Sequence, residues 1–385
     1  MFIVGLVGPF GSGCSYVASL ISERHGYNIL SLSDVLREEF IKDHPERECT
    51  RTALQDFGNK IRQDRGGAFL AEKVWGKIQA DTTKSYIVDS IRNPSEVDFF
   101  RSIHTNFFLF GVFAEPETRW QRIKEKYDND KREFEKDDER DSGEKEDYGQ
   151  RVTDTFRLSD IIILNRKNMV PGNEDHIGFC HKLQEKIDII ERRLSFKPTA
   201  NETYMTMAYA ASMRSSCIKR KVGSIIIDDC GNVFSSGYNE VPLLQRTCQQ
   251  EYNSCYRDKL KADFKQKLPR VLPDEGLIDS VYGIFKDSFK ILDYCRALHA
   301  EENAILNVAR IGASVALKTA TLYTTTYPCN LCANKIAKVN IKSVVYFEPY
   351  PMEEAKRILL ENHITQTPFE GVTHNAYFKL MEVVY

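Results

Sequence analysis

Three side chains able to bind a metal ion, with a carboxylate beside them, carry the clearest chemistry in this sequence. His299 stands just before Glu301, and Cys329 and Cys332 follow in the segment Pro-Cys-Asn-Leu-Cys. One imidazole and two thiolates fill three corners of a tetrahedral zinc site and leave the fourth for water, as in catalytic rather than structural zinc sites. We therefore predict that His299, Cys329 and Cys332 bind a catalytic Zn2+.

A bound zinc ion lowers the pKa of water from 15.7 to about 7, so that hydroxide is available at neutral pH. We expect Glu301 to be the general acid and base that moves the proton of this water, without binding the metal itself. The proline before Cys329 suits a helix start, where the positive end of the helix dipole favours thiolate. The alternative is an ordinary helix at His299 and an unrelated redox-active or structural Cys-x-x-Cys pair.

The order of the elements expected around these residues indicates a three-layer α/β/α domain. Residues 202–217 have a helical apolar face, and residues 222–228 and 233–238 alternate in polarity on either side of an Asp-Asp-Cys-Gly-Asn turn. Two further strands are predicted, at 320–325 before the cysteine helix and at 341–347 after it.

The N-terminal part holds a second chemical signature, a strand followed by Gly-Pro-Phe-Gly-Ser-Gly-Cys-Ser in the spacing of a P-loop. Glycines let backbone N–H groups point at phosphates, and Ser15 stands where a hydroxyl that binds Mg2+ belongs. Cys14 occupies the lysine position, which favours nucleotide binding over active phosphoryl transfer. The alternative is a purely structural glycine turn. The residues expected to contact the nucleotide are Gly8, Gly11, Ser12, Gly13, Cys14 and Ser15.

Other N-terminal segments fit a nucleotide-kinase architecture. Residues 86–89 form a buried strand that ends in Asp89, as at a Walker-B position, and Arg92 follows where it can meet a phosphate. Strands alternating with helices imply a parallel sheet with helices on both faces. We predict an α/β protein in which a P-loop nucleoside-kinase-like domain, 1–195, precedes the zinc-binding domain, 200–385.

Residues 124–151 carry charges of both signs almost continuously. Such a run is typical of a solvated helix or loop. The alternative is a kinase-like lid whose arginines reach the phosphates of a nucleotide. The candidate arginines are Arg119, Arg122, Arg132 and Arg140.

Charge and cysteine content exclude several classes of protein. The formal net charge is −2 and no long block of lysine and arginine is present, so we expect no polynucleotide partner. Ten cysteines in 385 residues are too sparse for a disulfide scaffold and are typical of a reducing cytosol. Apolar runs stay short of the roughly 18 residues of a membrane span, and the N-terminus lacks the charged start of a signal peptide. We expect a cytoplasmic protein with no membrane partner.

Motifs spread over the second domain carry a resemblance to a known family. His299-Ala-Glu-Glu-Asn-Ala-Ile, Gly237-Tyr-Asn and Arg214-Ser-Ser-Cys together look like a deoxycytidylate deaminase. The two halves resemble the anti-phage deoxycytidine nucleotide deaminases, which join a P-loop kinase-like domain to a cytidine deaminase-like domain.

This resemblance implies hydrolytic deamination of a free deoxycytidine nucleotide, dCTP somewhat ahead of dCMP, to the deoxyuridine nucleotide and ammonia. Glu301 would then protonate a ring nitrogen and the leaving amino group. Depletion of the deoxycytidine pool that phage replication needs would follow, and related deaminases commonly form homo-oligomers.

The resemblance also implies roles in substrate binding. Asn239 is expected to bind the deoxyribose hydroxyl and Tyr350 to line the pocket, while Arg214 and Lys221 offer charge to a 5′-phosphate. The alternatives are a turn-forming asparagine, a packing tyrosine and two solvated cations.

A second, structural zinc is a further expectation. Cys217 and Cys248 match cysteines that hold such an ion in phage deoxycytidylate deaminases, and Cys255 and Cys295 lie where they can complete a four-thiolate site. The alternative is four unreactive thiols.

Two other functions remain open on the sequence. An editing deaminase of RNA or single-stranded DNA uses the same zinc chemistry but needs a basic, aromatic-lined channel, which the near-neutral charge disfavours. The other alternative is a P-loop kinase or a nucleotide-binding regulator. Both functions can also be combined, with a P-loop domain that binds a regulatory nucleotide and restrains the deaminase.

Overall fold

The computed structural model describes the whole chain except residues 143–148, 167–171, 290, 313, 349–352 and 382–385. The chain divides into two compact units, the first formed by Met1–Glu202 with Glu370–Tyr385 and the second by Thr203–Phe369. The expected boundary at 195–199 lies close to the first crossing between them. The expected second domain, 200–385, differs at its other end, because the final segment joins the first unit.

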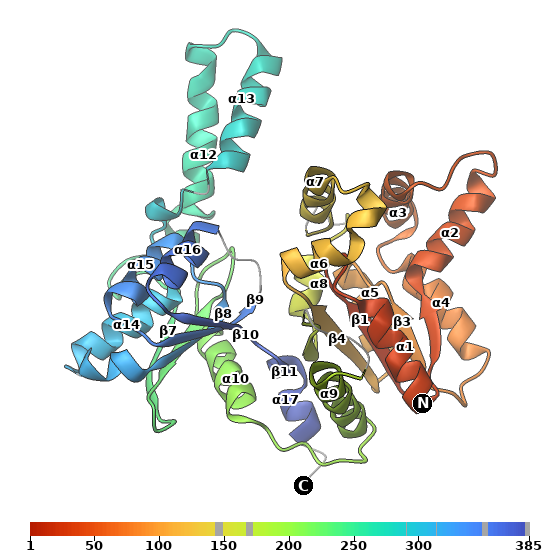
Figure 1. Ribbon diagram of the computed structural model, residues 1–385. Coiled ribbons are helices and arrows are strands. Elements are labelled where there is room, and N and C mark those ends of the chain that lie inside the picture. The colour runs from red at the N-terminus through yellow and green to blue at the C-terminus, as the bar shows by residue number, and fades with distance from the viewer. Residues whose placement is uncertain (143–148, 167–171, 290, 313, 349–352, 382–385) are drawn as a thin grey trace. The chain divides into compact units, whose positions relative to one another are not determined.

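The first unit contains a sheet whose described strands follow the order β11-β5-β4-β1-β3-β2. Figure 1 labels β1, β3, β4 and β11 of this sheet. Five of its strands are parallel: β1 (Ile3–Val7), β2 (Asn28–Ser31), β3 (Tyr86–Asp89), β4 (Phe107–Phe113) and β5 (Ile161–Leu164). The helices of this unit are α1 (Cys14–His25), α2 (Leu32–Asp43), α3 (Arg51–Arg65), α4 (Phe69–Gln79), α5 (Pro94–Ile103), α6 (Pro116–Ile123), α7 (Lys131–Ser142), α8 (Val152–Arg157), α9 (Glu174–Ile190) and α17 (His374–Met381).

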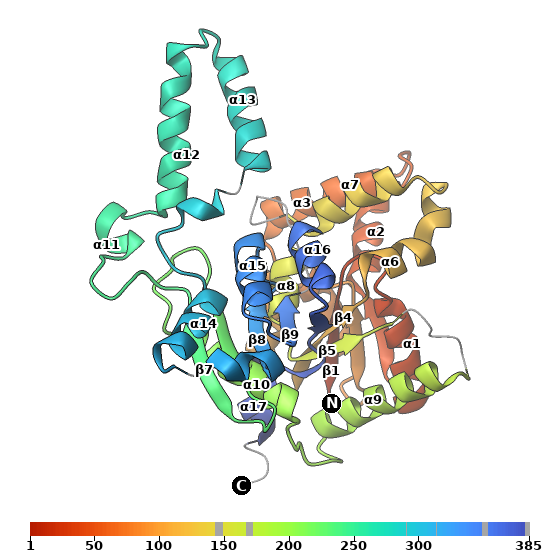
Figure 2. The same ribbon diagram turned by 60° about the vertical axis from the view of Figure 1, so that its left-hand side comes forward.

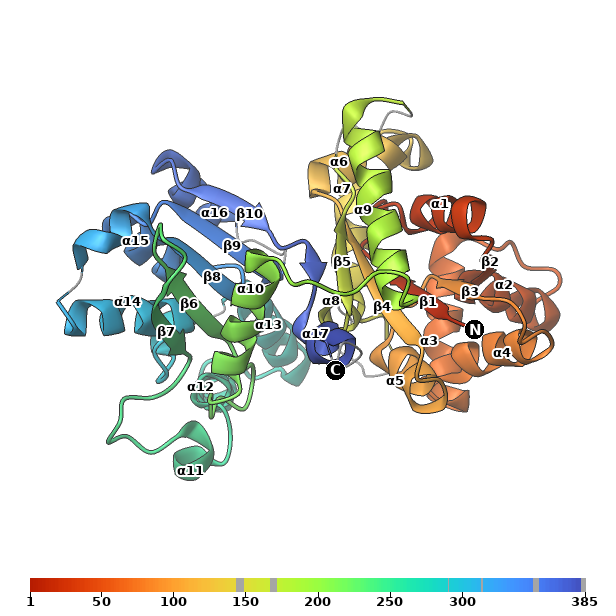
Figure 3. The ribbon, with the colours of Figure 1, turned by 90° about the horizontal axis from the view of Figure 1, so that it is seen from below.

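Alternate residues of β4 show how the sheet is covered on both faces. Phe108 and Phe110 belong to the core that α1 and α9 complete on one face. Phe107 points to the other face and stacks on Phe100 of α5, with ring centroids 5.2 Å apart. Figure 3 shows α1 and α9 on one side of these strands and α5 on the other. This is the expected parallel sheet between two helical layers.

The last described segment completes the first unit rather than the second. Strand β11 (Gly371–Val372) pairs antiparallel with β5. The Thr373 hydroxyl donates to the Ser159 carbonyl at 2.6 Å, and the Lys379 ammonium donates to the Thr105 carbonyl at 2.8 Å. These bonds attach α17 to the sheet that begins some 370 residues earlier in the sequence, which explains the difference from the expected boundary.

The second unit contains a sheet whose described strands follow the order β10-β9-β8-β6-β7. Its strands are β6 (Gly223–Ile227), β7 (Val233–Tyr238), β8 (Thr321–Thr326), β9 (Ser343–Glu348) and β10 (Thr365–Pro368). Its helices are α10 (Ala200–Ser212), α11 (Cys248–Tyr252), α12 (Tyr256–Lys267), α13 (Glu275–Ser288), α14 (Ala300–Arg310), α15 (Asn330–Lys338) and α16 (Glu353–Glu361).

Helices cover both faces of this second sheet. Ala304 of α14, Ile336 of α15 and Leu359 of α16 share one core with the strands. On the opposite face, Tyr209 of α10 packs edge-on against Phe347 of β9, with centroids 5.2 Å apart. The expected three-layer α/β/α fold is confirmed.

Helices α12 and α13 run as an antiparallel pair away from the second sheet (Figure 2). Phe264 of α12 and Phe285 of α13 lie 4.3 Å apart, centroid to centroid, and join the two helices. Among the described residues, no helix of either unit has both the length and the apolar character that a membrane crossing requires.

Candidate active site

Two helix starts bring the predicted zinc ligands together. His299 is the residue before α14 and Cys329 the residue before α15, each with an extended backbone at the N-cap position. Cys332 lies in the first turn of α15. The first backbone N–H groups of a helix carry partial positive charge, which stabilises thiolates placed there. The sequence signal for this arrangement was the proline before Cys329.

The donor atoms of these residues face one another. Nδ1 of His299 lies 3.2 Å from Sγ of Cys329 and 3.3 Å from Sγ of Cys332. All three donor atoms lie within 4.8 Å of one another. Bond lengths of 2.3 Å to sulfur and 2.0–2.1 Å to nitrogen at a tetrahedral angle would place nitrogen and sulfur about 3.5 Å apart. One nitrogen and two sulfurs at this spacing therefore fit a zinc ion.

The three side chains of the cluster shift one another's pKa values. Hydrogen bonds from Cys332 and then from His299 lower the pKa of the Cys329 thiol to about 4, against the effect of burial. The Cys332 thiol, bonded to that thiolate and buried, has its pKa raised well above the usual value. Contacts with Cys295 and Cys329 raise the pKa of His299 to about 10. Metal binding at this cluster would release protons.

Glu301 lies beside the cluster, inside the protein. Its side chain is buried, and the Cys332 thiol donates to its Oε2 at 3.6 Å. Burial raises the pKa of this carboxyl, and the charge of His299 opposes that rise. A carboxyl in this position can take up and return a proton next to the ligands without being one of them.

One residue of the site, Glu302, was not predicted from the sequence. Its carboxylate accepts a hydrogen bond from the His299 backbone N–H at 3.3 Å, closing a capping box at the start of α14. The same carboxylate pairs with Lys335 of α15 at 2.7 Å and so ties the two helix starts together. The signal was available, because a glutamate three residues after an N-cap is the capping-box pattern.

Asn239, expected to bind the sugar, makes two hydrogen bonds to backbone. Its Oδ1 accepts from the Val222 N–H and its Nδ2 donates to the Arg220 carbonyl, both at 2.8 Å. The amide therefore organises the loop before β6, with one N–H left for another acceptor. Arg214 and Lys221 are exposed at the same end of the hairpin, with the Arg214 guanidinium 4.9 Å from the Tyr238 ring centroid. Tyr350 lies outside the described residues.

The four cysteines expected to hold a structural zinc do not come together. Their sulfurs form no group of three or more donor atoms within 4.8 Å in the part of the chain that the structure describes. Cys248 starts α11 and Cys255 precedes α12. Cys295 contacts the His299 imidazole, and this contact lowers the pKa of the Cys295 thiol. The fourth, Cys217, is half-buried before β6. All ten cysteines are free thiols.

The P-loop lies between β1 and α1, as expected. Gly13 has φ +95°, and a Cβ there would stand 2.3 Å from the Asn165 amide nitrogen, so only glycine suits this position. The Ser15 hydroxyl donates to Asp89 at 2.8 Å, which places the two oxygen ligands of a Walker-type Mg2+ site together. Burial, and then the charge of Asp89, raise the pKa of the Cys14 thiol to about 12, so this residue supplies no charge.

Two of the four predicted lid arginines reach the P-loop backbone. Arg119 donates to the Phe10 carbonyl at 3.0 Å, and Arg122 donates to the Ser12 carbonyl at 3.3 Å. The other two, Arg132 and Arg140, lie on α7. Arg132 is exposed, and Arg140 pairs with an aspartate of α3 at 2.6 Å.

Comparison with known proteins agrees with both sites. Residues 198–348 match the cytidine and deoxycytidylate deaminase zinc-binding region, and residues 4–143 match an AAA domain. A deoxycytidylate deaminase of Mycobacterium phage D29 is 33% identical over 150 residues, which cover 39% of this chain and 95% of the phage protein. A UPF0200 protein of Methanothermobacter thermautotrophicus is 28% identical over 190 residues, covering 48% of this chain and 93% of that protein.

Longer relatives match only in part. The deoxycytidylate deaminase of Saccharomyces cerevisiae is 33% identical over 199 residues, which cover 49% of this chain and 54% of the yeast protein. The chain thus spans about half the length of that relative. A solved dCMP deaminase of cyanophage S-TIM5 aligns with 45% of this chain and all of its own, at 22% identity and a TM-score of 0.30. The chain belongs to the cytidine and deoxycytidylate deaminase family, with its zinc-binding region joined to a P-loop domain.

Proposed function

We propose that this protein hydrolyses the exocyclic amino group of a free deoxycytidine nucleotide, giving the deoxyuridine nucleotide and ammonia. The observation that carries the proposal is the cluster of His299, Cys329 and Cys332 with the buried carboxylate of Glu301 beside it. Relatives named deoxycytidylate deaminase support the substrate class.

Each residue of the site has a defined task in this reaction. His299, Cys329 and Cys332 would hold a zinc ion, which when bound supplies an activated water at neutral pH. Glu301 accepts a proton from the attacking water and passes it to the ring nitrogen next to C4. It then takes the second proton from the hydroxyl now on C4, which becomes the carbonyl, and gives it to the amino group that leaves as ammonia. Glu302 and Lys335 keep the two helix starts in register, so that the ligands and the carboxylate hold their spacing.

Glu301→Ala tests the mechanism. We expect the variant to keep its metal and to lose ammonia release by a factor of about 10³ or more, because the proton carrier is gone. Glu361→Gln, an exposed change on α16, is the control and should retain full activity. Substantial turnover by Glu301→Ala would remove the mechanism.

The finer substrate and the biological role are part of the same proposal. We infer that dCTP is preferred to dCMP, that the enzyme acts in the cytoplasm as a homo-oligomer, and that it depletes the nucleotide pool during phage infection. A panel of cytidine and deoxycytidine mono-, di- and triphosphates, followed by mass detection, tests the preference. Faster turnover of dCMP than of dCTP would reverse it.

We further propose that the P-loop binds a regulatory nucleotide with Mg2+. The pairing of Ser15 with Asp89 and the glycine-only conformation at Gly13 support binding, while the uncharged Cys14 disfavours phosphoryl transfer. Titration of Mg2+-ATP into the full chain, with deaminase activity measured in parallel, tests both binding and regulation. ATP consumption with a nucleotide acceptor would instead support a kinase.

A further inference from the structure

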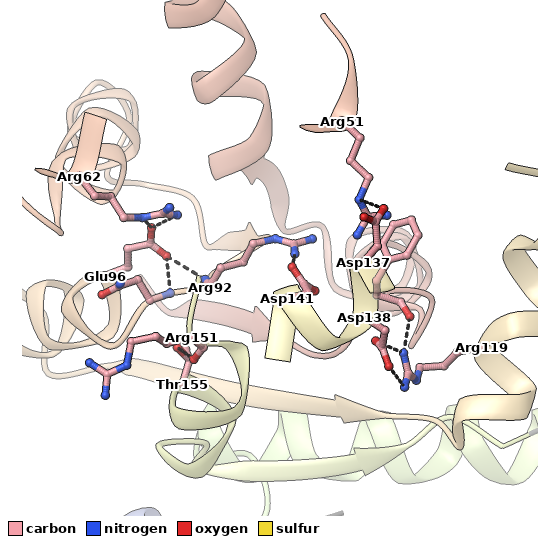
Figure 4. Close-up of polar contacts among 12 residues, drawn as sticks. Arg51, Arg62, Arg92, Glu96, Arg119, Asp137, Asp138, Asp141, Arg151 and Thr155 are labelled. Carbon is pink, nitrogen blue, oxygen red and sulfur yellow. Dashed lines mark hydrogen bonds and ion pairs between the residues drawn. The ribbon is translucent and has the colours of Figure 1, made fainter. Parts of the chain in front are cut away.

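Three arginines near the P-loop are paired with three aspartates of a single helix, α7. The arginines come from α3, from the loop after β3 and from α6. Figure 4 shows the aspartates along α7 meeting them. The pairs are Arg51–Asp137 at 3.3 Å, Arg92–Asp141, and Arg119–Asp138 at 2.5 and 2.8 Å.

The same arginines belong to the surroundings of the P-loop. Arg119 donates to the Phe10 carbonyl at 3.0 Å, and the Arg51 guanidinium lies 3.6 Å from the centroid of the Phe10 ring. Burial raises the pKa of Cys14, and Arg92 is near enough for its charge to oppose that rise. Helix α7 therefore contacts the groups that surround the phosphate-binding loop.

The positive charge that a P-loop normally takes from its lysine has to come from elsewhere here, because Cys14 is neutral. Arginine is well suited, since its planar guanidinium binds carboxylates and phosphates in the same two-pronged geometry. The Arg119 side chain is 3% exposed and that of Asp141 only 1%. A guanidinium so deeply buried needs an anion, and in this conformation α7 provides it.

The pairing leaves polar atoms of the network unsatisfied. Nε of Arg119 and Oδ2 of Asp141 are buried without a hydrogen-bond partner. One turn along α3 from Arg51, Gln55 is 5% exposed, and both atoms of its amide lack a partner. Buried polar atoms in native proteins are nearly always bonded, so this network can accept another ligand.

We propose that the carboxylates of α7 are a built-in competitor for the phosphate groups of the P-loop ligand. Asp137, Asp138 and Asp141 occupy the arginines, and a phosphorylated nucleotide binds fully only when α7 gives them up. The inference rests on nucleotide binding by the P-loop, proposed above. The apparent affinity for the nucleotide is then lower than the intrinsic affinity, because only the molecules with α7 released can bind it fully.

The test compares two double variants of α7 in the full chain. Asp138→Asn with Asp141→Asn removes two paired carboxylates, while Glu135→Gln with Glu139→Gln removes the same charge from the exposed face of the helix. Calorimetric titration with Mg2+-ATP should show at least about tenfold tighter binding for the first variant than for the wild type or the control. Asp138→Asn alone, at a partly exposed residue, repeats the test should the double variant not fold.

Trp120 reports on α7 directly. It is buried against Phe134 of α7, with ring centroids 5.5 Å apart, and Trp75→Phe leaves it the sole tryptophan of the chain. Saturating Mg2+-ATP should shift its emission, as should the aspartate substitutions without ligand.

Equal or weaker ATP binding by the aspartate variants, or an unmoved Trp120 signal, overturns the inference and leaves P-loop binding intact. Loss of binding in Gly13→Ala supports the loop as the site. If neither the wild type nor the aspartate variants bind Mg2+-ATP, the proposed P-loop function fails as well.

Discussion

The two candidate sites of this chain differ in the state of their charged groups. In the second unit, the donor atoms of one imidazole and two thiols come together from two helix starts. In the first unit, arginines near the P-loop already hold carboxylates of α7. The spacing of the donor atoms suits the zinc site to its ligand, whereas under our proposal the P-loop site has to exchange carboxylates for phosphates.

The largest expected effect is at the zinc site. Cys332→Ala removes a zinc ligand, so metal content and ammonia release should both fall, activity by more than about 10³-fold. Mg2+-ATP binding at the P-loop should stay as it is. Elemental analysis of the purified protein and calorimetry measure the two, and Cys230→Ala, at an exposed turn thiol, is the control. Retained zinc in Cys332→Ala would contradict the assigned ligand set.

Acid should weaken the first unit. Burial, reinforced by Arg101, lowers the pKa of His374 to about 4 in the folded protein, below its usual 6.5. The unfolded state therefore binds more protons, and stability present above pH 6.5 is lost as the pH falls toward 4, by about 3 kcal/mol at most.

Tryptophan fluorescence reports this unit alone, because both tryptophans, Trp75 and Trp120, belong to it. Chemical denaturation at pH 7 and pH 5 measures the loss of stability, which should be smaller in His374→Phe. His181→Asn, at an exposed histidine of α9, should behave like the wild type. An unchanged pH dependence in His374→Phe would assign the acid sensitivity to other groups.

A substitution in the P-loop backbone tests the other site of the comparison. Gly13→Ala puts a Cβ at φ +95° and against the Asn165 amide, which costs about 1–3 kcal/mol and displaces the phosphate-binding N–H groups. We expect Mg2+-ATP affinity to fall by about tenfold or more while zinc content is kept. Gly76→Ala, a helical glycine with open space around it, should instead stabilise the unit by about 0.5–1 kcal/mol. Unaltered ATP affinity in Gly13→Ala would place the nucleotide elsewhere.

The smallest effect concerns Asn239. Asn239→Ala removes its bonds to the Val222 N–H and the Arg220 carbonyl, so the second unit should lose about 1–2 kcal/mol. Thermal inactivation of the deaminase measures this loss. A role in holding the sugar would in addition raise KM for the deoxynucleotide without a matching change in kcat. A normal KM would leave Asn239 a purely structural role.

Local motifs predicted candidate residues of both sites, because each motif is a short continuous segment of the sequence. The P-loop and the Cys329–Cys332 pair lie where a strand is followed by a helix, Asp89 ends β3, and His299 directly precedes α14. The features that were not predicted depend on contacts between residues far apart in the sequence. The bonds from Thr373 to the Ser159 carbonyl and from Lys379 to the Phe107 carbonyl are of this kind.

The charged run at 124–151 shows the same limit. A solvated helix and a lid were both open interpretations, and part of the run forms the helix α7, which has one solvated face and one face paired with arginines. Glu135 and Glu139 face solvent, while Asp137, Asp138 and Asp141 reach arginines that come from three other segments. Charge content alone did not separate these two faces, since which aspartates turn inward depends on where Arg51, Arg92 and Arg119 lie.

The return of the chain at Glu370 to the sheet where it began constrains how such a protein can be built from parts. Because β11 and α17 complete the first unit, the catalytic unit is an insertion within it rather than a module appended to its end. Truncating the gene at codon 370 would keep the predicted zinc ligands and remove β11 and α17 from the P-loop unit. An exchange of deaminases between relatives would need two splice points.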